Sequence, residues 1–193
     1  MVTTELIRTL FSASTIKRWN DKLRPIDFIE FDKAAHKMFI AYLLGACQER
    51  STPVLWRDVI EGGLFSFLQK TVLTDLKPTI LSMIHKDPVK CRQLNTYVYS
   101  ELEPMLKPFG DEFCNRFRQY FEQSAETLER RILNAASILS TRWEFDIIER
   151  ADPHGFEIPE IREILEKKLE RYADLEGMKE FFSHASMRHF VDL

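Results

Sequence analysis

The chain has 193 residues and a formal net charge of −3, with both signs mixed along its length, so it lacks the basic field that holds a nucleic-acid backbone. Nucleic acid is therefore not an expected partner. Apolar residues make up 45% of the chain, which is enough for the core of one large domain, and we expect a single domain over residues 1–193. Fifteen Phe and three Trp beside only six Gly favour packed helices over a strand-rich fold.

Two features of the sequence indicate a cytoplasmic protein. The longest apolar run, residues 39–47, is well short of the ~20 residues that a helix needs to cross a bilayer. The N-terminus has no basic start before an apolar block and so does not resemble a signal peptide. Cys47, Cys91 and Cys114 lie at wide spacings without a CxxC pair, and we expect three reduced thiols, at least two of them buried.

Apolar spacing predicts the helices of the first half, and proline and glycine predict their limits. The predicted helices cover residues 4–19, 31–47, 55–73, 79–86 and 91–106. Thr3 or Thr4 can serve as the N-cap of the first. The second is apolar nearly all round and is therefore expected to be central. Pro104 is expected to interrupt the last helix, which Pro108 and Gly110 end.

Two long helices are predicted over residues 113–149, with a break near Ser124 to Thr127. Pro159 then predicts the start of a charged helix over residues 160–175, on which Glu163 and Lys167 form an i, i+4 ion pair. A last helix is expected over residues 176–190. The sequence has neither a stretch that alternates at period two nor an internal repeat, so the predicted fold class is all-α.

Four segments carry a resemblance to a known family. They read 14-STIKRWNDKLRP-25, 32-DKAAHKMFIAYLLG-45, 62-GGLFSFLQKTVLTD-75 and 131-RILNAASIL-139. Together they resemble the 5′-deoxynucleotidase-like branch of the HD superfamily of metal-dependent phosphohydrolases. The resemblance implies a multi-helix, HD-domain-like bundle.

In that family a histidine on an early helix, a His-Asp pair on a second helix and an aspartate on a later one hold a divalent metal, which polarises a phosphate and activates water. His36 matches the first ligand. Ser66 and Phe67 stand where the His-Asp pair would be, Lys70 replaces an acidic residue, and the last aspartate falls near Ser137. The resemblance thus implies that this chain alone holds no metal; an active form would use Mn, Co, Ni, Mg or Zn.

Further residues match family positions near the substrate. Asp75 matches a carboxylate beside the substrate, yet Asp75 and Lys77 also precede Pro78 at a predicted helix start, where an aspartate is often an N-cap and free amides can bind an anion. Arg18 and Trp19 resemble positions that line the phosphate and base side of the pocket, or they form a stacked surface pair.

His36 shares one predicted helix face with Ile40, Leu43 and Cys47. Two interpretations stay open: a core histidine with its hydrogen bonds satisfied, or a remnant ligand that still contacts a small molecule.

Two functions follow from these residues. The favoured one is a non-catalytic regulatory, ligand-binding or dimerisation module associated with a metal-dependent phosphohydrolase, with a homodimer or an intact HD phosphohydrolase domain as partner and a nucleotide as ligand. The alternative is an active nucleotide phosphohydrolase with a rearranged metal set of His36, Asp75 and His85. The chain could also be the N-terminal half of a longer two-part protein, or a separately encoded relative of one.

Overall fold

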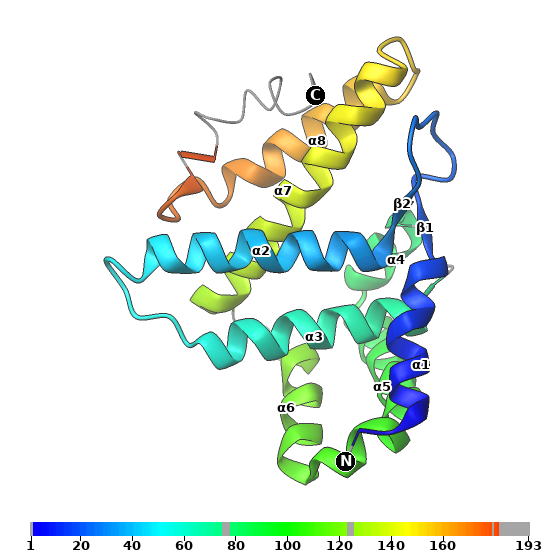
Figure 1. Cartoon of the computed structure of the whole chain (residues 1–193), viewed down its shortest axis with the longest axis vertical. Helices are drawn as coiled ribbons and strands as arrows, with labels where there is room; N and C mark the ends of the chain where they lie inside the picture. Colours follow the sequence, from blue (N-terminus) through cyan, green and yellow to red (C-terminus); the bar gives the residue numbers. More distant parts are fainter. Residues whose placement is uncertain (1, 75–77, 123–125, 179, 182–193) are drawn as a thin grey trace. The chain divides into compact units, whose positions relative to one another are not determined.

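A computed structural model describes residues 2–74, 78–122, 126–178 and 180–181 of the chain, and its elements are helices apart from one short pair of strands (Figure 1). The predicted all-α class is confirmed. In chain order the elements are α1 (Thr4–Ser12), a 3-10 turn (Ala13–Thr15), β1 (Lys17–Arg18), β2 (Phe28–Ile29), α2 (Glu30–Gln48), α3 (Trp56–Val72), α4 (Pro78–His85), α5 (Pro88–Leu106), a second 3-10 turn (Lys107–Phe109), α6 (Asp111–Glu122), α7 (Leu128–Ala151) and α8 (Ile158–Glu170).

The chain divides into two compact units, each formed by two separate stretches. The α5 unit comprises Met1–Ile16 and Glu61–Glu126, and the α7 unit comprises Lys17–Ile60 and Thr127–Leu193. The division falls within α3, whose first turn belongs to the α7 unit. The single domain expected from the sequence stays a prediction.

The α7 unit is built on the contact between α2 and α7, with α8 packed on α7. Its larger core cluster joins one side of α2, including Ile40 and Leu44, to the first turns of α7, including Ile132 and Leu139. A second cluster joins Phe28 of β2 to the later turns of α7 and to α8. Burial of these aliphatic and aromatic side chains is the main force that holds the helices together.

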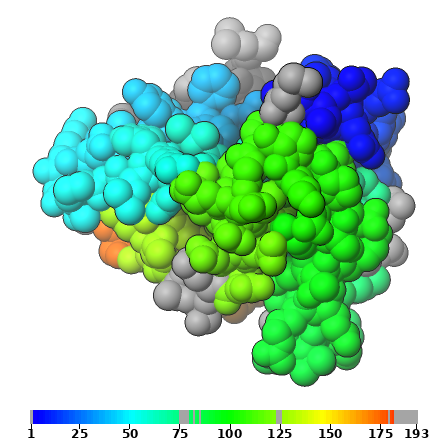
Figure 2. Space-filling model, turned by 90° about the horizontal axis from the view of Figure 1, so that it is seen from below, coloured from blue at the N-terminus to red at the C-terminus, as the bar shows by residue number. Residues whose placement is uncertain are grey.

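The α5 unit has its own core, in which α5 contacts α1, α4 and α6. In Figure 2 the green surface of α5 and α6 is continuous. The ring of Phe65 makes edge contacts with the rings of Phe113, Phe117 and Tyr120, at centroid distances of 5.3, 5.1 and 5.8 Å. The Phe-rich stretch on α6 therefore contributes mainly to a core.

Several local predictions are confirmed. The side chain of Thr3 accepts a hydrogen bond from the backbone N–H of Leu6 and is the N-cap of α1. A break separates α6, which ends at Glu122, from α7, which begins at Leu128. Glu163 and Lys167 form the expected ion pair on α8.

Other local predictions are wrong, each for an identifiable reason. The first helix ends at Ser12 rather than near residue 19, because Lys17 and Arg18 pair with the strand Phe28–Ile29. Helix α5 continues through Pro104 to Leu106, since a proline so close to the C-terminus disrupts little of the helix. The helix expected from Pro159 to residue 175 ends at Glu170, and residues 171–177 form turns.

Two burial predictions also need correction. Of the three cysteines only Cys114 is buried, whereas Cys47 and Cys91 are half-buried. Helix α2 is less central than its composition predicted, because Phe39, Tyr42 and Leu43 are exposed. The helix predicted over residues 176–190 lies largely outside the described residues. Among the described residues, no helix combines the length and hydropathy that crossing a bilayer requires.

Candidate functional site

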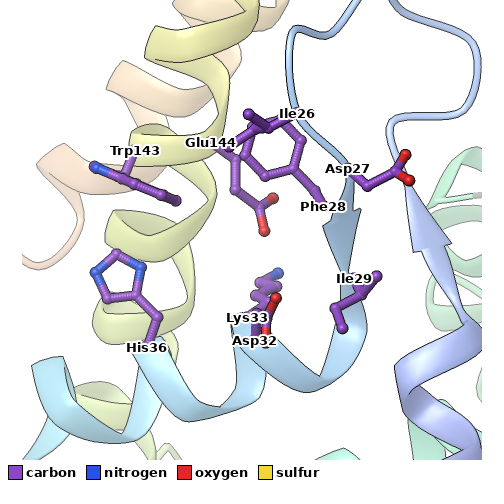
Figure 3. Close-up of a pocket in the computed structure, with 9 residues that line it drawn as sticks. All are labelled: Ile26, Asp27, Phe28, Ile29, Asp32, Lys33, His36, Trp143 and Glu144. Atoms are coloured by element: carbon purple, nitrogen blue, oxygen red, sulfur yellow. The ribbon is translucent and has the colours of Figure 1, made fainter. Parts of the chain in front are cut away.

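A pocket of about 350 Å³ lies in the α7 unit, between the β1–β2 strand pair and the helices α2 and α7 (Figure 3). Nine residues line it: Ile26, Asp27, Phe28, Ile29, Asp32, Lys33, His36, Trp143 and Glu144. Figure 3 shows His36 and Trp143 together on one side, with Lys33 and Glu144 pointing into the space between the two helices. A cavity of this size suits a small organic molecule.

The strand pair contributes Phe28 and Ile29 to the lining of this pocket. Arg18 on β1 faces Phe28 on β2, and Lys17 faces Ile29. Several contacts fasten the loop between the strands, among them those from Lys17 Nζ to the Asp27 carboxylate at 3.1 Å and from Arg24 Nη1 to the Arg18 carbonyl at 2.6 Å. Helix α2 begins directly after β2, so the lining residues of the hairpin and those of the first turns of α2 lie next to one another.

A buried ion network adjoins the pocket through Glu144, its one member among the lining residues. Arg18 Nε donates to both carboxylate oxygens of Glu144 at 3.0 and 3.1 Å, and Arg18 Nη2 donates to Glu144 at 2.9 Å. Arg18 Nη1 donates to Glu30 at 2.7 Å. Trp19 Nε1 adds a further hydrogen bond to Glu144 at 2.7 Å. All three guanidinium nitrogens of Arg18 thus bind carboxylates of its own chain.

Burial and charge act in opposite directions on this network. Burial alone would lower the pKa of Arg18, but the carboxylates of Glu144 and Glu30 outweigh it and the pKa is raised. The Arg18 side chain is 17% exposed and that of Glu144 only 4%. Arg18 therefore stays charged and paired. It lies beside the pocket, as the sequence predicted, but its guanidinium forms ion pairs with Glu144 and Glu30.

His36 lies on α2 at the opposite side of the pocket. Its ring makes an edge contact with Trp143 at 5.1 Å, and its Nδ1 is 3.4 Å from Ser140 Oγ, at the limit of a hydrogen bond. Burial lowers the pKa of His36, against the opposing charge of Glu144. The imidazole is therefore neutral at physiological pH, with a polar partner on one nitrogen.

The other metal positions do not form a family-type donor set with His36. Ser66 Oγ donates to the carbonyl of Gly63, and Phe67 has no ligand atom. Ser137 is on α7, where its carbonyl accepts a hydrogen bond from Thr141. Within the described ranges, no group of three or more His, Cys, Asp or Glu side chains could hold a metal ion. The described residues at these positions therefore do not supply the donors that the family's divalent metal needs.

Asp75 and Lys77 lie outside the described residues, so their predicted roles at the substrate and at a helix start stay predictions. Among the described candidates, His36 lines the pocket, while Arg18 and Trp19 lie beside it through their hydrogen bonds to the lining residue Glu144. Sequence reasoning missed Glu144, which lines the pocket, and Glu30, which shares Arg18 with it. A signal for Glu144 was present in the sequence: it lies between Trp143 and Phe145, whose apolar rings indicate burial, and a buried glutamate needs a cationic partner.

Comparison with solved structures supports the fold. The crystal structure of an HD-domain phosphohydrolase from Listeria innocua matches with a TM-score of 0.69 and 18% identity, over 95% of this chain and 87% of that chain. The chain therefore has an HD-domain-like fold, as the resemblance predicted. No protein-family model and no curated protein matches the sequence. At this identity the likeness defines the fold and not the activity.

Proposed function

We propose that this chain is a non-catalytic HD-like module that binds a small, planar organic ligand in the pocket beside His36. The pairing of Arg18 with Glu144 and Glu30 is the observation that carries the proposal. A phosphate is bound best by an arginine whose N–H groups are available to it. Here the guanidinium already has two carboxylates within hydrogen-bond distance, so the network carries a net negative charge before any ligand arrives.

The chemistry of the lining supports a ligand without a phosphate group. Trp143 and Phe28 meet edge to face at 6.3 Å and offer aromatic surface to a flat ring. The neutral imidazole of His36 adds a third ring without adding charge. Asp32 and Glu144 add negative charge, and a phosphate about 6 Å from one carboxylate meets roughly 3 kcal/mol of repulsion per pair of unit charges at an effective dielectric near 20. Lys33 is the one cation among the lining residues.

The missing donor set supports the non-catalytic part of the proposal. Hydrolysis in the family requires a metal that activates water, and serine and phenylalanine at positions 66 and 67 cannot replace a His-Asp pair. The alternative set of His36, Asp75 and His85 includes residues outside those the structure describes, and no contact of the described residues favours it. A regulatory role beside an intact phosphohydrolase domain remains part of the proposal.

Binding can be followed through tryptophan fluorescence, using a nucleoside and its 5′-monophosphate as a matched pair of probes. We expect the nucleoside to change the emission and to bind at least about tenfold more tightly than the monophosphate, a difference of ~1.4 kcal/mol. Trp143→Phe should abolish most of the signal. Trp56→Phe is the control, because Trp56 contacts Tyr42 outside the pocket.

A parallel assay tests catalysis directly. The chain is incubated with nucleoside monophosphates and Mn²⁺ or Co²⁺, and phosphate release is measured together with bound metal by elemental analysis. We expect neither turnover nor stoichiometric metal. Turnover that is lost in His36→Ala, or tighter binding of the monophosphate that is lost in Arg18→Gln, would overturn the proposal.

A further inference from the structure

The carboxylate of Glu144 has an acceptor position that the described residues leave unused. Its Oε2 accepts hydrogen bonds from Trp19 Nε1 at 2.7 Å and from Arg18 Nη2 at 2.9 Å. Arg18 Nε lies between the two oxygens, at 3.0 Å from Oε1 and 3.1 Å from Oε2. Among the residues that the structure describes, this shared N–H is the one donor to Oε1. Each carboxylate oxygen has about two lone-pair positions, so Oε1 can accept a further hydrogen bond.

This unused acceptor belongs to a residue that lines the pocket. Glu144 is one of the lining residues, although its side chain is only 4% exposed. In Figure 3 its carboxylate points into the space between α2 and α7. A hydrogen bond to an ionised acceptor is stronger than one between neutral groups, and more so away from bulk water. A donor on a ligand in the pocket would therefore find a strong partner in Glu144 Oε1.

Aromatic surface lies beside this acceptor. Trp143 precedes Glu144 on α7, and the ring of Trp143 lies 6.3 Å from that of Phe28 and 5.1 Å from that of His36. All three rings line the same pocket as Glu144. A flat ligand can bury its ring against these side chains. Such a ligand also needs a polar group at its edge, because displacing water from a carboxylate without replacing the hydrogen bond loses affinity.

The charges around Glu144 favour a donor over an acceptor at the edge of the ligand. Glu144 and its neighbour Glu30 carry two negative charges against a single arginine. Of the other lining charges, Asp27 is paired with basic residues of the hairpin, and those of Asp32 and Lys33 offset each other. A carbonyl oxygen on the ligand would point its lone pairs at the carboxylate of Glu144, and this repulsion would select against it. An amino group meets the same carboxylate with N–H donors.

We propose that the ligand of this pocket is a flat aromatic ring that bears an amino group, and that this amino group donates a hydrogen bond to Glu144 Oε1. The inference rests on the proposed function, since it names the chemical class of the same ligand. Glu144 is the residue that determines specificity. Glu30 holds the same arginine from a position outside the lining, so it stabilises the network without contacting the ligand.

Two nucleosides that differ only in this group test the proposal on the unmodified protein. Adenosine carries an amino group on its ring, and purine riboside has a hydrogen in its place. We expect isothermal titration calorimetry to give a dissociation constant at least about tenfold lower for adenosine. The adenosine analogue with two methyl groups on the amino nitrogen has no N–H there, and it should bind no better than purine riboside. This comparison of ligands depends on no substitution in the protein.

Two matched variants test the role of Glu144. Glu144→Gln and Glu30→Gln each remove one carboxylate from the same arginine, but of the two only Glu144 lines the pocket. We expect the preference for adenosine to fall to within about threefold in Glu144→Gln and to persist in Glu30→Gln, with circular dichroism to establish that both variants fold. Equal binding of adenosine and purine riboside, a preference that survives in Glu144→Gln, or its equal loss in both variants would refute this inference while leaving a ligand-binding pocket. Binding of neither nucleoside would instead refute the proposed function, and this inference with it.

Discussion

Replacing Arg18 by methionine tests the ion network at the pocket. The substitution keeps much of the side-chain volume but removes the cation between Glu144, which is 4% exposed, and Glu30, which is 10% exposed. Removing one partner of a buried ion pair leaves a charge without compensation and costs about 3–5 kcal/mol. Since small domains unfold with about 5–15 kcal/mol, a loss of this size is readily measured.

Urea unfolding followed by tryptophan fluorescence is the appropriate assay. The three tryptophans, Trp19, Trp56 and Trp143, all belong to the α7 unit, so their emission reports the unfolding of that unit. Arg18→Lys serves as the control, because it keeps the charge but not the forked geometry and should cost less than methionine. Glu144→Gln added to Arg18→Met should recover about 1–2 kcal/mol, since it removes the unpaired charge.

The stability of Arg18→Met also decides between two roles of the arginine. A change below about 0.5 kcal/mol is typical of a surface substitution and would refute the reasoning, because Arg18 would then be available to an external anion. A loss without recovery in the double variant would place the effect in packing rather than in charge.

Three further predictions concern the α7 unit. Burial lowers the pKa of His36 below its ordinary 6.5, so the unfolded chain binds more protons than the folded chain, and stability falls as the pH drops from 6.5 toward the lowered pKa. His36→Gln should therefore flatten the profile of urea midpoints against pH in that window. An unchanged profile would contradict this. In Gly45→Ala the new Cβ would lie 2.6 Å from Trp56 Cη2. We therefore expect the free energy of unfolding, measured by thermal unfolding, to fall by about 1–3 kcal/mol despite the better helix propensity of alanine. Adding Trp56→Leu should recover this loss. Thr127→Ala removes the N-cap bond to Arg130 N and should cost about 1 kcal/mol, whereas Thr127→Ser should cost much less in the same assay.

Local signals in the sequence were sufficient for most helices but not for the strand pair. The spacing of Ile132 and Leu139 and the N-cap Thr3 depend on nearby residues, so the sequence alone predicted them. The pairing of Lys17–Arg18 with Phe28–Ile29 involves only two residues on each strand. Strands of this length are too short to show a period-two pattern in the sequence. The prediction of a helix to residue 19 was wrong for this reason.

The pocket shows more clearly that local sequence patterns do not predict contacts between distant residues. The family resemblance brought Arg18, Trp19 and His36 to attention, and the α7 unit does bring them near one cavity. The partner that determines the state of Arg18 is Glu144, which is 126 positions away along the chain. Sequence spacing cannot identify such a contact, because it depends on how the strand pair meets α7. Likewise, composition predicted a central α2 and could not show which of its apolar sides would be exposed.

Trp19 links the network to the fold of the hairpin. Its φ of 57° lies in the left-handed region, which costs about 1–3 kcal/mol for a residue of this size. The hydrogen bond from Trp19 Nε1 to Glu144 and the packing of its ring near Phe145 offset that cost. Glu144 therefore binds both the guanidinium of Arg18 and the indole of the next residue, Trp19.

This double role bears on the affinity for phosphate. An anion can recruit Arg18 only if the guanidinium leaves Glu144, which would then be buried with Trp19 as its remaining donor among the contacts described above. The free energy of that exchange is close to the cost of Arg18→Met, about 3–5 kcal/mol. At ~1.4 kcal/mol for each factor of ten, it lowers the affinity for a phosphate by roughly a hundredfold to a few thousandfold. We therefore expect the contacts that stabilise the hairpin to oppose the binding of a phosphorylated ligand.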